Sequence, residues 1–262
     1  MKRLSVFTII AFAVLLAAVP AFAANRVITN GVDLWVTKGN GRTFADFSKE
    51  SLPAGFFCSG SEPFTGKVVL RGVPIATGQP GILGPTDTII QRLDNATFNK
   101  RGVATTRIQM RAMQFESVAP VKTACGDFKL TVTLDGEQPI TTMRIVRDSA
   151  KGGRFYAPIW VNVKLSFTPI GRVTTEALEL RKALRFPPAP IAYWSTLDRP
   201  AGPALEGFVK VDTDSDGIPD TFLPGISNFA AGRSPFPQKI VADDICHTED
   251  EGVHCTSGFY YY

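Results

Sequence analysis

Apolar and polar residues alternate through much of the chain, and the clearest example runs from Phe155 to Phe167. From Ile159 onward, every second residue of this segment is apolar. A period of two is typical of a β-strand with one buried face. The same pattern predicts strands over 128–134 and 108–115. In the second of these the phase slips at Met113, which indicates a β-bulge.

Shorter alternating segments predict further strands over 32–37, 67–73, 88–93 and 143–147. Residues Asp148–Gly153 have the composition of a hairpin loop. One segment, Thr174–Leu184, predicts a helix, because Ala177, Leu178 and Leu184 would share one helical face. Many short strands separated by Gly and Pro turns predict an all-β fold with an antiparallel, sandwich-like body.

Residues 1–23 have the features of a secretory signal peptide. Lys2 and Arg3 precede an apolar run, and Ala21-Phe22-Ala23 is a small-residue cleavage pattern. We expect cleavage after Ala23 and export from a bacterial cell, to the periplasm, the cell surface or the medium. An uncleaved membrane anchor is the alternative, but the run is shorter than the ~20 residues that a span needs. No later segment predicts a transmembrane span.

Export places the cysteines in an oxidising compartment, where an even number favours disulfides. The chain has four: Cys58, Cys125, Cys246 and Cys255. Four cysteines allow three pairings. The simplest closes a short C-terminal hairpin with Cys246–Cys255 and joins two distant segments with Cys58–Cys125.

Charge is distributed unevenly along the chain. Residues 25–199 carry 23 basic and 14 acidic side chains, whereas residues 200–262 carry 3 basic and 10 acidic ones. The change lies near a proline-rich joint at Phe186–Pro190. We therefore predict a body over 24–186 and an acidic C-terminal segment over 187–262. The body has no basic cluster interleaved with aromatic residues, so we do not expect a nucleic-acid partner.

Three short runs in the body, Asp87–Arg92, Met143–Arg147 and Gly152–Phe155, resemble segments of secreted bacterial β-rich proteins. This resemblance covers about 80 residues and brings no catalytic motif with it.

The sharpest motif in the sequence is Asp-x-Asp-x-Asp-Gly-x-x-Asp, which we call the acidic loop (Asp212–Asp220). Its carboxylates are Asp212, Asp214, Asp216 and Asp220, and the backbone carbonyl of Ile218 is a fifth candidate ligand. Hard oxygen ligands of this kind suit Ca²⁺. Without a cation, four carboxylates so close together repel one another. The alternative is an acidic turn that binds no ion.

An EF-hand would require Glu at the twelfth position of the loop, where Leu223 stands. The acidic loop instead resembles the thrombospondin type 3 calcium repeat, whose signature it matches at Asp212, Asp214, Asp216, Gly217 and Asp220. The resemblance implies a structural calcium ion. That family uses tandem copies, whereas this chain has a single one.

Both histidines of the chain lie beside the late cysteines, as Cys246-His247 and His254-Cys255. A Cys246–Cys255 disulfide would bring His247 and His254 together, and with a nearby carboxylate they could bind Zn²⁺ or Cu²⁺. A disulfide-closed surface hairpin with solvated histidines is the simpler interpretation.

No nucleophile elbow, zinc-protease or phosphate-loop motif occurs in the sequence. We therefore expect an exported structural or binding protein, adhesion-like, with a surface glycan or protein as partner. A secreted carbohydrate-active hydrolase is the alternative, which a cleft with two carboxylates about 5–10 Å apart would favour. Exposed Trp160, Tyr193 or Trp194 would favour a binding module. Self-association through the aromatic tail Gly258–Tyr262, as in a fibre subunit, is a third possibility.

Overall fold

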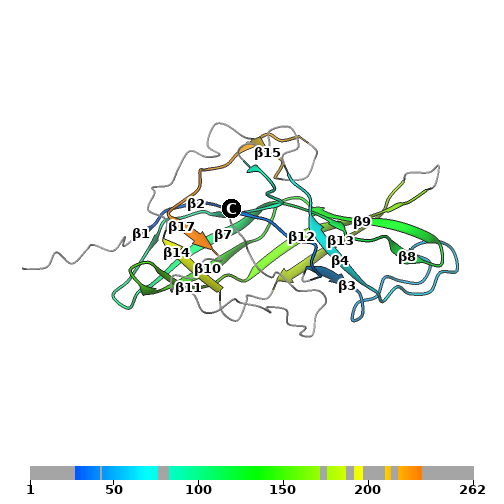
Figure 1. Cartoon of the computed structure of the whole chain (residues 1–262), viewed down its shortest axis with the longest axis horizontal. Coiled ribbons are helices and arrows are strands. Elements are labelled where there is room, and N and C mark those ends of the chain that lie inside the picture. The colour runs from blue at the N-terminus through cyan, green and yellow to red at the C-terminus, as the bar shows by residue number, and fades with distance from the viewer. Residues whose placement is uncertain are drawn as a thin grey trace, which may run out of the picture.

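The computed structural model describes residues 27–41, 43–75, 83–171, 176–186, 192–196, 210–213 and 218–231. This part of the chain is nearly all β and forms a sandwich-like body of antiparallel strands, which confirms the predicted fold class (Figure 1). The signal peptide, Asp214, Asp216, Cys246, His247, His254 and Cys255 lie outside the described residues.

Thirteen of the described strands belong to one branched sheet. The strands in chain order are β1 (Val27–Ile28), β2 (Gly31–Trp35), β3 (Phe44–Asp46), β4 (Lys67–Gly72), β5 (Thr88–Arg92), β6 (Ala96–Thr97), β7 (Val103–Ser117), β8 (Val121–Thr123), β9 (Gly126–Leu134), β10 (Ile140–Ser149), β11 (Gly152–Tyr156), β12 (Ile159–Pro169), β13 (Leu178–Phe186), β14 (Ala192–Thr196), β15 (Lys210–Val211), β16 (Thr221–Phe222) and β17 (Phe229–Ala231).

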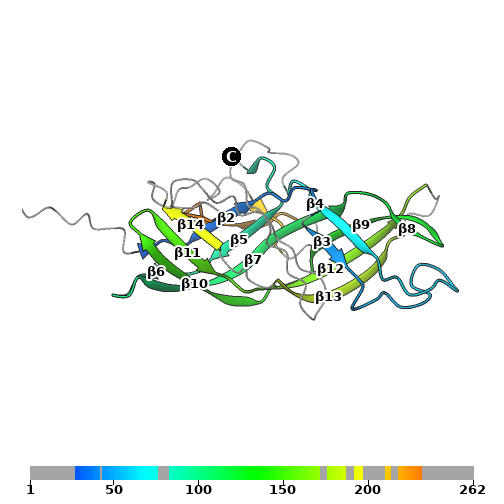
Figure 2. The same cartoon turned by 60° about the horizontal axis from the view of Figure 1, so that its bottom comes forward.

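The long strand β7 runs through both ends of the molecule. Its first part, up to Met113, pairs with β10 on one side and β5 on the other. Its last part, from Gln114, pairs with β9 and β4. β7 therefore divides the sheet into two halves, which lie at opposite ends of the elongated molecule in both views (Figures 1 and 2).

The closed half consists of β2, β5, β10, β11, β14 and β17 with the first part of β7. Its two outer strands approach each other, because Val32 of β2 forms a parallel bridge with Ile226, three residues before β17. The Val32 amide donates to the carbonyl of Gly225 at 3.1 Å. Gly31 permits this approach, since a Cβ there would lie 2.8 Å from the Gly225 oxygen.

The open half consists of β3, β4, β9, β12 and β13 with the last part of β7, and β8 at the side of β9. β3 pairs with β4, and β13 pairs with β12. Among the described residues, neither β3 nor β13 has a strand partner on its other side. This half therefore ends in two free edges, which lie close to each other in Figure 2.

Two apolar clusters hold the sheet together. The larger fills the interior of both halves and includes Ile108, Leu130, Val163 and Phe167, all almost fully buried. The smaller lies on the other face of β2, β5 and β7, where Val211 and Leu223 pack on it from the acidic segment. Strands buried on both faces lose the simple alternation that marks a surface strand.

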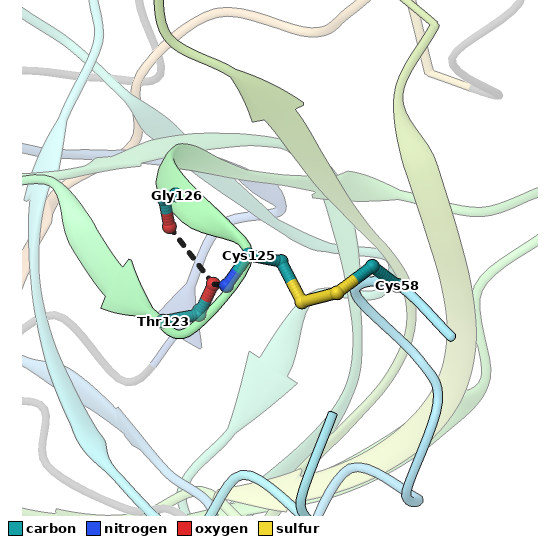
Figure 3. Close-up of a disulfide and its surroundings, with 4 residues drawn as sticks. All are labelled: Cys58, Thr123, Cys125 and Gly126. Atoms are coloured by element: carbon teal, nitrogen blue, oxygen red, sulfur yellow. Dashed lines mark hydrogen bonds between the residues drawn. A yellow bond between two sulfur atoms is a disulfide. The ribbon is translucent and has the colours of Figure 1, made fainter. Parts of the chain in front are cut away.

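A disulfide between Cys58 and Cys125 confirms the predicted pairing and joins positions 67 residues apart (Figure 3). Thr123 orders the turn at Cys125: its hydroxyl donates to the Gly126 carbonyl at 2.8 Å and accepts from the Cys125 amide at 3.0 Å. The segment after β3 is thereby fastened to the β8–β9 turn. Rings of the same segment, Phe56 and Phe57, pack against Phe167 of β12.

The predicted helix at Thr174–Leu184 is wrong, because its described part from Leu178 onward is β13. Leu178, Leu180 and Leu184 alternate along this strand, but Lys182 occupies the position between the last two and hides the period of two.

The single strand predicted over Phe155–Phe167 is divided into β11 and β12 at Ala157-Pro158, where proline supplies no amide for a ladder. The predicted bulge in β7 is confirmed, and its extra residue is Arg111, since Met110 and Ala112 face consecutive residues of β5.

Two strands of the acidic C-terminal segment belong to the same sheet as the body. β14 pairs with β11, and β17 pairs with β14. Trp194 of β14 is buried between the rings of Phe98 and Phe229, at centroid distances of 5.9 and 5.2 Å. Its indole nitrogen donates to the Val146 carbonyl at 3.1 Å. These strands are thus part of the closed half rather than of a separate unit.

Candidate functional site

The acidic loop connects two strands that pair with each other. β15 and β16 are antiparallel, with Lys210 opposite Phe222 and Val211 opposite Thr221. The pairing brings the two ends of the motif together, as the sequence requires if Asp212 and Asp220 are to act on one ion. Of the five predicted ligand residues, Asp212, Ile218 and Asp220 are described.

Hydroxyl groups link the two sides of this hairpin. The Thr221 hydroxyl donates to a carboxylate oxygen of Asp220 at 3.1 Å. The Thr213 and Thr221 hydroxyl oxygens lie 3.0 Å apart. Since Thr221 has one proton and gives it to Asp220, Thr213 is the donor in the second bond. A short chain of hydrogen bonds thus orients the Asp220 carboxylate from the neighbouring strand.

Apolar side chains anchor the hairpin on the closed half. Val211, just before the acidic loop, and Leu223, just after β16, are buried against Val32, Ile89 and Ala112. In contrast, Ile218 and Phe222 are 61% and 53% exposed. The hairpin therefore has a fixed base on the sheet, and its exposed residues include two large apolar side chains.

The chain after β16 is fixed by a buried polar cluster that the sequence did not predict. Arg92 of β5 donates to the Asp33 carboxylate of β2 and to the Ser227 hydroxyl. All three side chains are buried, and the Arg92 guanidinium also lies 4.7 Å from the centre of the Phe229 ring. The partners of Arg92 are 59 and 135 residues away in sequence, so no local pattern signals them.

Among the described residues, no group of three His, Cys, Asp or Glu side chains is placed to hold a metal ion. The candidate ligand set remains the acidic loop, whose donors are carboxylate and carbonyl oxygens, the ligands that Ca²⁺ takes.

A cavity of about 100 Å³ lies in the open half, between β3 with the segment that follows it and β13. Its walls are mostly apolar: Phe44, Phe47, Leu52, Leu70, Met113, Phe115, Val132, Leu165, Leu180 and Leu184. Three charged residues line it as well. Lys182 of β13 pairs with Glu50 of the segment after β3, and hydrogen bonds from Ser48 lower the pKa of Asp46.

Two carboxyl groups have a strongly raised pKa, which is a common property of catalytic acids. Burial raises the pKa of Asp33 and of Asp87 to about 6. Asp33 is the partner of Arg92. Asp87 accepts hydrogen bonds from the Thr37 amide and, at 2.8 Å, from the Thr88 hydroxyl. Both are buried and neither lines the cavity, so their environment is that of structural carboxyls.

The aromatic residues named as possible binding positions differ in exposure. Trp160 on β12 is 45% exposed, and Arg185 lies 5.4 Å from its ring centre. Tyr193 is half-buried, and Trp194 is fully buried in the stack described above. These three side chains therefore do not form one exposed aromatic face.

No helix among the described residues has the length and apolar character to cross a membrane. Comparison of the chain with protein-family models, with curated proteins and with solved structures found no match.

Proposed function

We propose that this chain is an exported bacterial structural or binding protein of the cell surface or extracellular space, with an acidic loop that binds one calcium ion. The observation that carries the proposal is the Asp-x-Asp-x-Asp-Gly-x-x-Asp motif, set between two strands that pair at its ends. Four carboxylates this close together in the sequence would repel one another, and a bound cation would offset that repulsion.

Calcium binding would stabilise more than the loop itself. The residues on either side of the hairpin, Val211 and Leu223, belong to the apolar cluster on β2, β5 and β7. A ligand that binds the folded state and not the unfolded chain stabilises the whole cooperative unit. Calcium binding to the acidic loop would thus stabilise the closed half as well.

The outer surface of the same hairpin suggests where a partner would bind. Ile218 and Phe222 are large apolar side chains that are more than half exposed, one within the acidic loop and one in β16. We take these two side chains as candidate contact residues for a partner. A surface protein or glycan is the expected partner, and assembly through Gly258–Tyr262 is the alternative.

Thermal unfolding of the mature, oxidised protein in calcium and in excess chelator tests this proposal. An ion at 100 times its dissociation constant contributes about 2.7 kcal/mol, which corresponds to several degrees in Tm. The double variant Asp214→Ala/Asp216→Ala should lose the shift. The control Asp127→Ala/Glu176→Ala removes two exposed carboxylates elsewhere and should keep it. An absence of any calcium shift in the wild type would overturn the proposal.

A further inference from the structure

The cavity of the open half is a partly open apolar pocket. It measures about 100 Å³ and is lined mainly by aliphatic and aromatic side chains of β3, β4, β7, β12 and β13. An enclosed apolar cavity of about 150 Å³ can bind benzene, so a pocket of this size can take an apolar chain of a few carbons.

The position of Lys182 is unusual for a lysine. It lies on the inward side of β13, between Leu180 and Leu184, and all three line the cavity. The neighbouring cation Arg181 points to the other face, is largely exposed and pairs with Asp135. The Lys182 side chain is 29% exposed, so a charge sits at the edge of an apolar space.

The partner of Lys182 is less firmly held than Lys182 itself. Glu50 belongs to the segment after β3 rather than to a strand, and its side chain is 66% exposed. It can turn into water at little cost, since exposed ion pairs contribute at most about 1 kcal/mol. The other carboxylate that lines the cavity, Asp46, has Lys49 and Lys67 beside it. Displacement of Glu50 would therefore leave the Lys182 ammonium without a carboxylate partner.

We propose that this cavity binds a small amphipathic carboxylate, with its hydrocarbon end among the apolar walls and its carboxylate on the Lys182 ammonium in place of Glu50. The walls supply the apolar burial, and Lys182 selects the charge of the head group. Both β3 and β13 line the cavity and, among the described residues, they share no ladder, so they can separate without breaking one. The site is separate from the acidic loop and independent of calcium.

Calorimetric titration with three probes that share one short chain, chosen to match a cavity of about 100 Å³, tests the proposal: butyrate, 1-butanol and butyltrimethylammonium. The wild type should bind butyrate at least tenfold more tightly than either of the others. Lys182→Gln should remove this preference. The matched control Arg181→Gln, which alters the adjacent cation on the outer face, should retain it.

Two cavity-filling variants, Leu180→Trp and Leu184→Phe, locate the bound chain. Each that remains folded by circular dichroism should lose binding of all three probes. The proposal is overturned by an absence of butyrate binding, by equal affinity for butyrate and 1-butanol, or by binding that survives in a folded cavity-filling variant.

Discussion

The two halves of the sheet share strand β7 but end in different ways. In the closed half, the outer strand β2 meets Gly225 and Ile226, and the buried Arg92–Asp33–Ser227 cluster fixes the approach. In the open half, β3 and β13 face each other across a cavity, and the partly exposed pair of Lys182 and Glu50 spans the gap.

The difference shows where this fold can change shape. Charged groups that are buried and hydrogen-bonded to each other impose one arrangement, because separating them leaves a charge without water or partner. An exposed ion pair over an apolar void imposes little. We therefore expect the closed half to supply rigidity for the acidic loop and the open half to supply adaptability for a ligand. The following predictions test this contrast.

The largest effect is expected from Arg92→Met. This change leaves the Asp33 carboxylate buried without its cation, which costs about 3–5 kcal/mol in the free energy of unfolding. Denaturant unfolding measures the loss. The double variant Arg92→Met/Asp33→Leu removes both charges and should recover a substantial part of it. A loss below about 1 kcal/mol in the single variant would mean that the cluster does not fix the closed half.

The next largest effect is expected from the disulfide of the open half. Cys58→Ser/Cys125→Ser opens a loop of 67 residues and should lower the free energy of unfolding by about 2–4 kcal/mol. Because the disulfide fastens the segment that forms one wall of the cavity, butyrate binding should weaken as well. Unchanged stability in the serine variant under oxidising conditions would contradict this role.

Asp87 makes the stability of the junction between the halves depend on pH. Its carboxylate leaves no room for a Cβ at Gly72 of β4, and it accepts from Thr37 after β2. Burial raises its pKa from 3.8 to about 6, so between these values the folded protein keeps a proton that the unfolded chain has lost. The contribution of Asp87 to stability therefore falls by up to about 3 kcal/mol as pH rises through this range.

Urea unfolding of the wild type and Asp87→Asn at pH 4 and pH 7 measures this contribution. The variant should gain stability relative to the wild type on going to pH 7. Asp94→Asn is the control, because Arg107 lowers the pKa of Asp94 and its pH dependence has the opposite sign. An identical pH dependence in the wild type and Asp87→Asn would show that Asp87 is ionised without penalty.

The smallest effect on stability is expected from Glu50→Gln. Loss of this largely exposed pair should change the free energy of unfolding by less than about 1 kcal/mol. If Glu50 competes with a bound carboxylate for Lys182, the same variant should bind butyrate more tightly than the wild type. A large loss of stability would show instead that the pair is needed to hold β13 and the segment after β3 together.

The sequence predicted the all-β fold because one-sided strands show their alternation directly, as in residues 128–134. It failed at β13, because Lys182 interrupts the alternating leucines. Only the structure shows that Lys182 lines the cavity with them. It predicted the Cys58–Cys125 pairing by parsimony. It could not predict the Arg92 cluster, which forms between distant segments. The acidic loop could be proposed from sequence as a calcium site because its candidate ligands lie close together in the chain.

Hydrogen exchange measured by mass spectrometry, in calcium and in chelator, tests most directly whether calcium fixes the acidic loop on the closed half. Peptides that cover residues 210–223 should exchange more slowly with calcium, whereas peptides of β13 should exchange at the same rate in both conditions. No change over 210–223 would contradict the claim. An equal change in β13 would contradict the independence of the two halves.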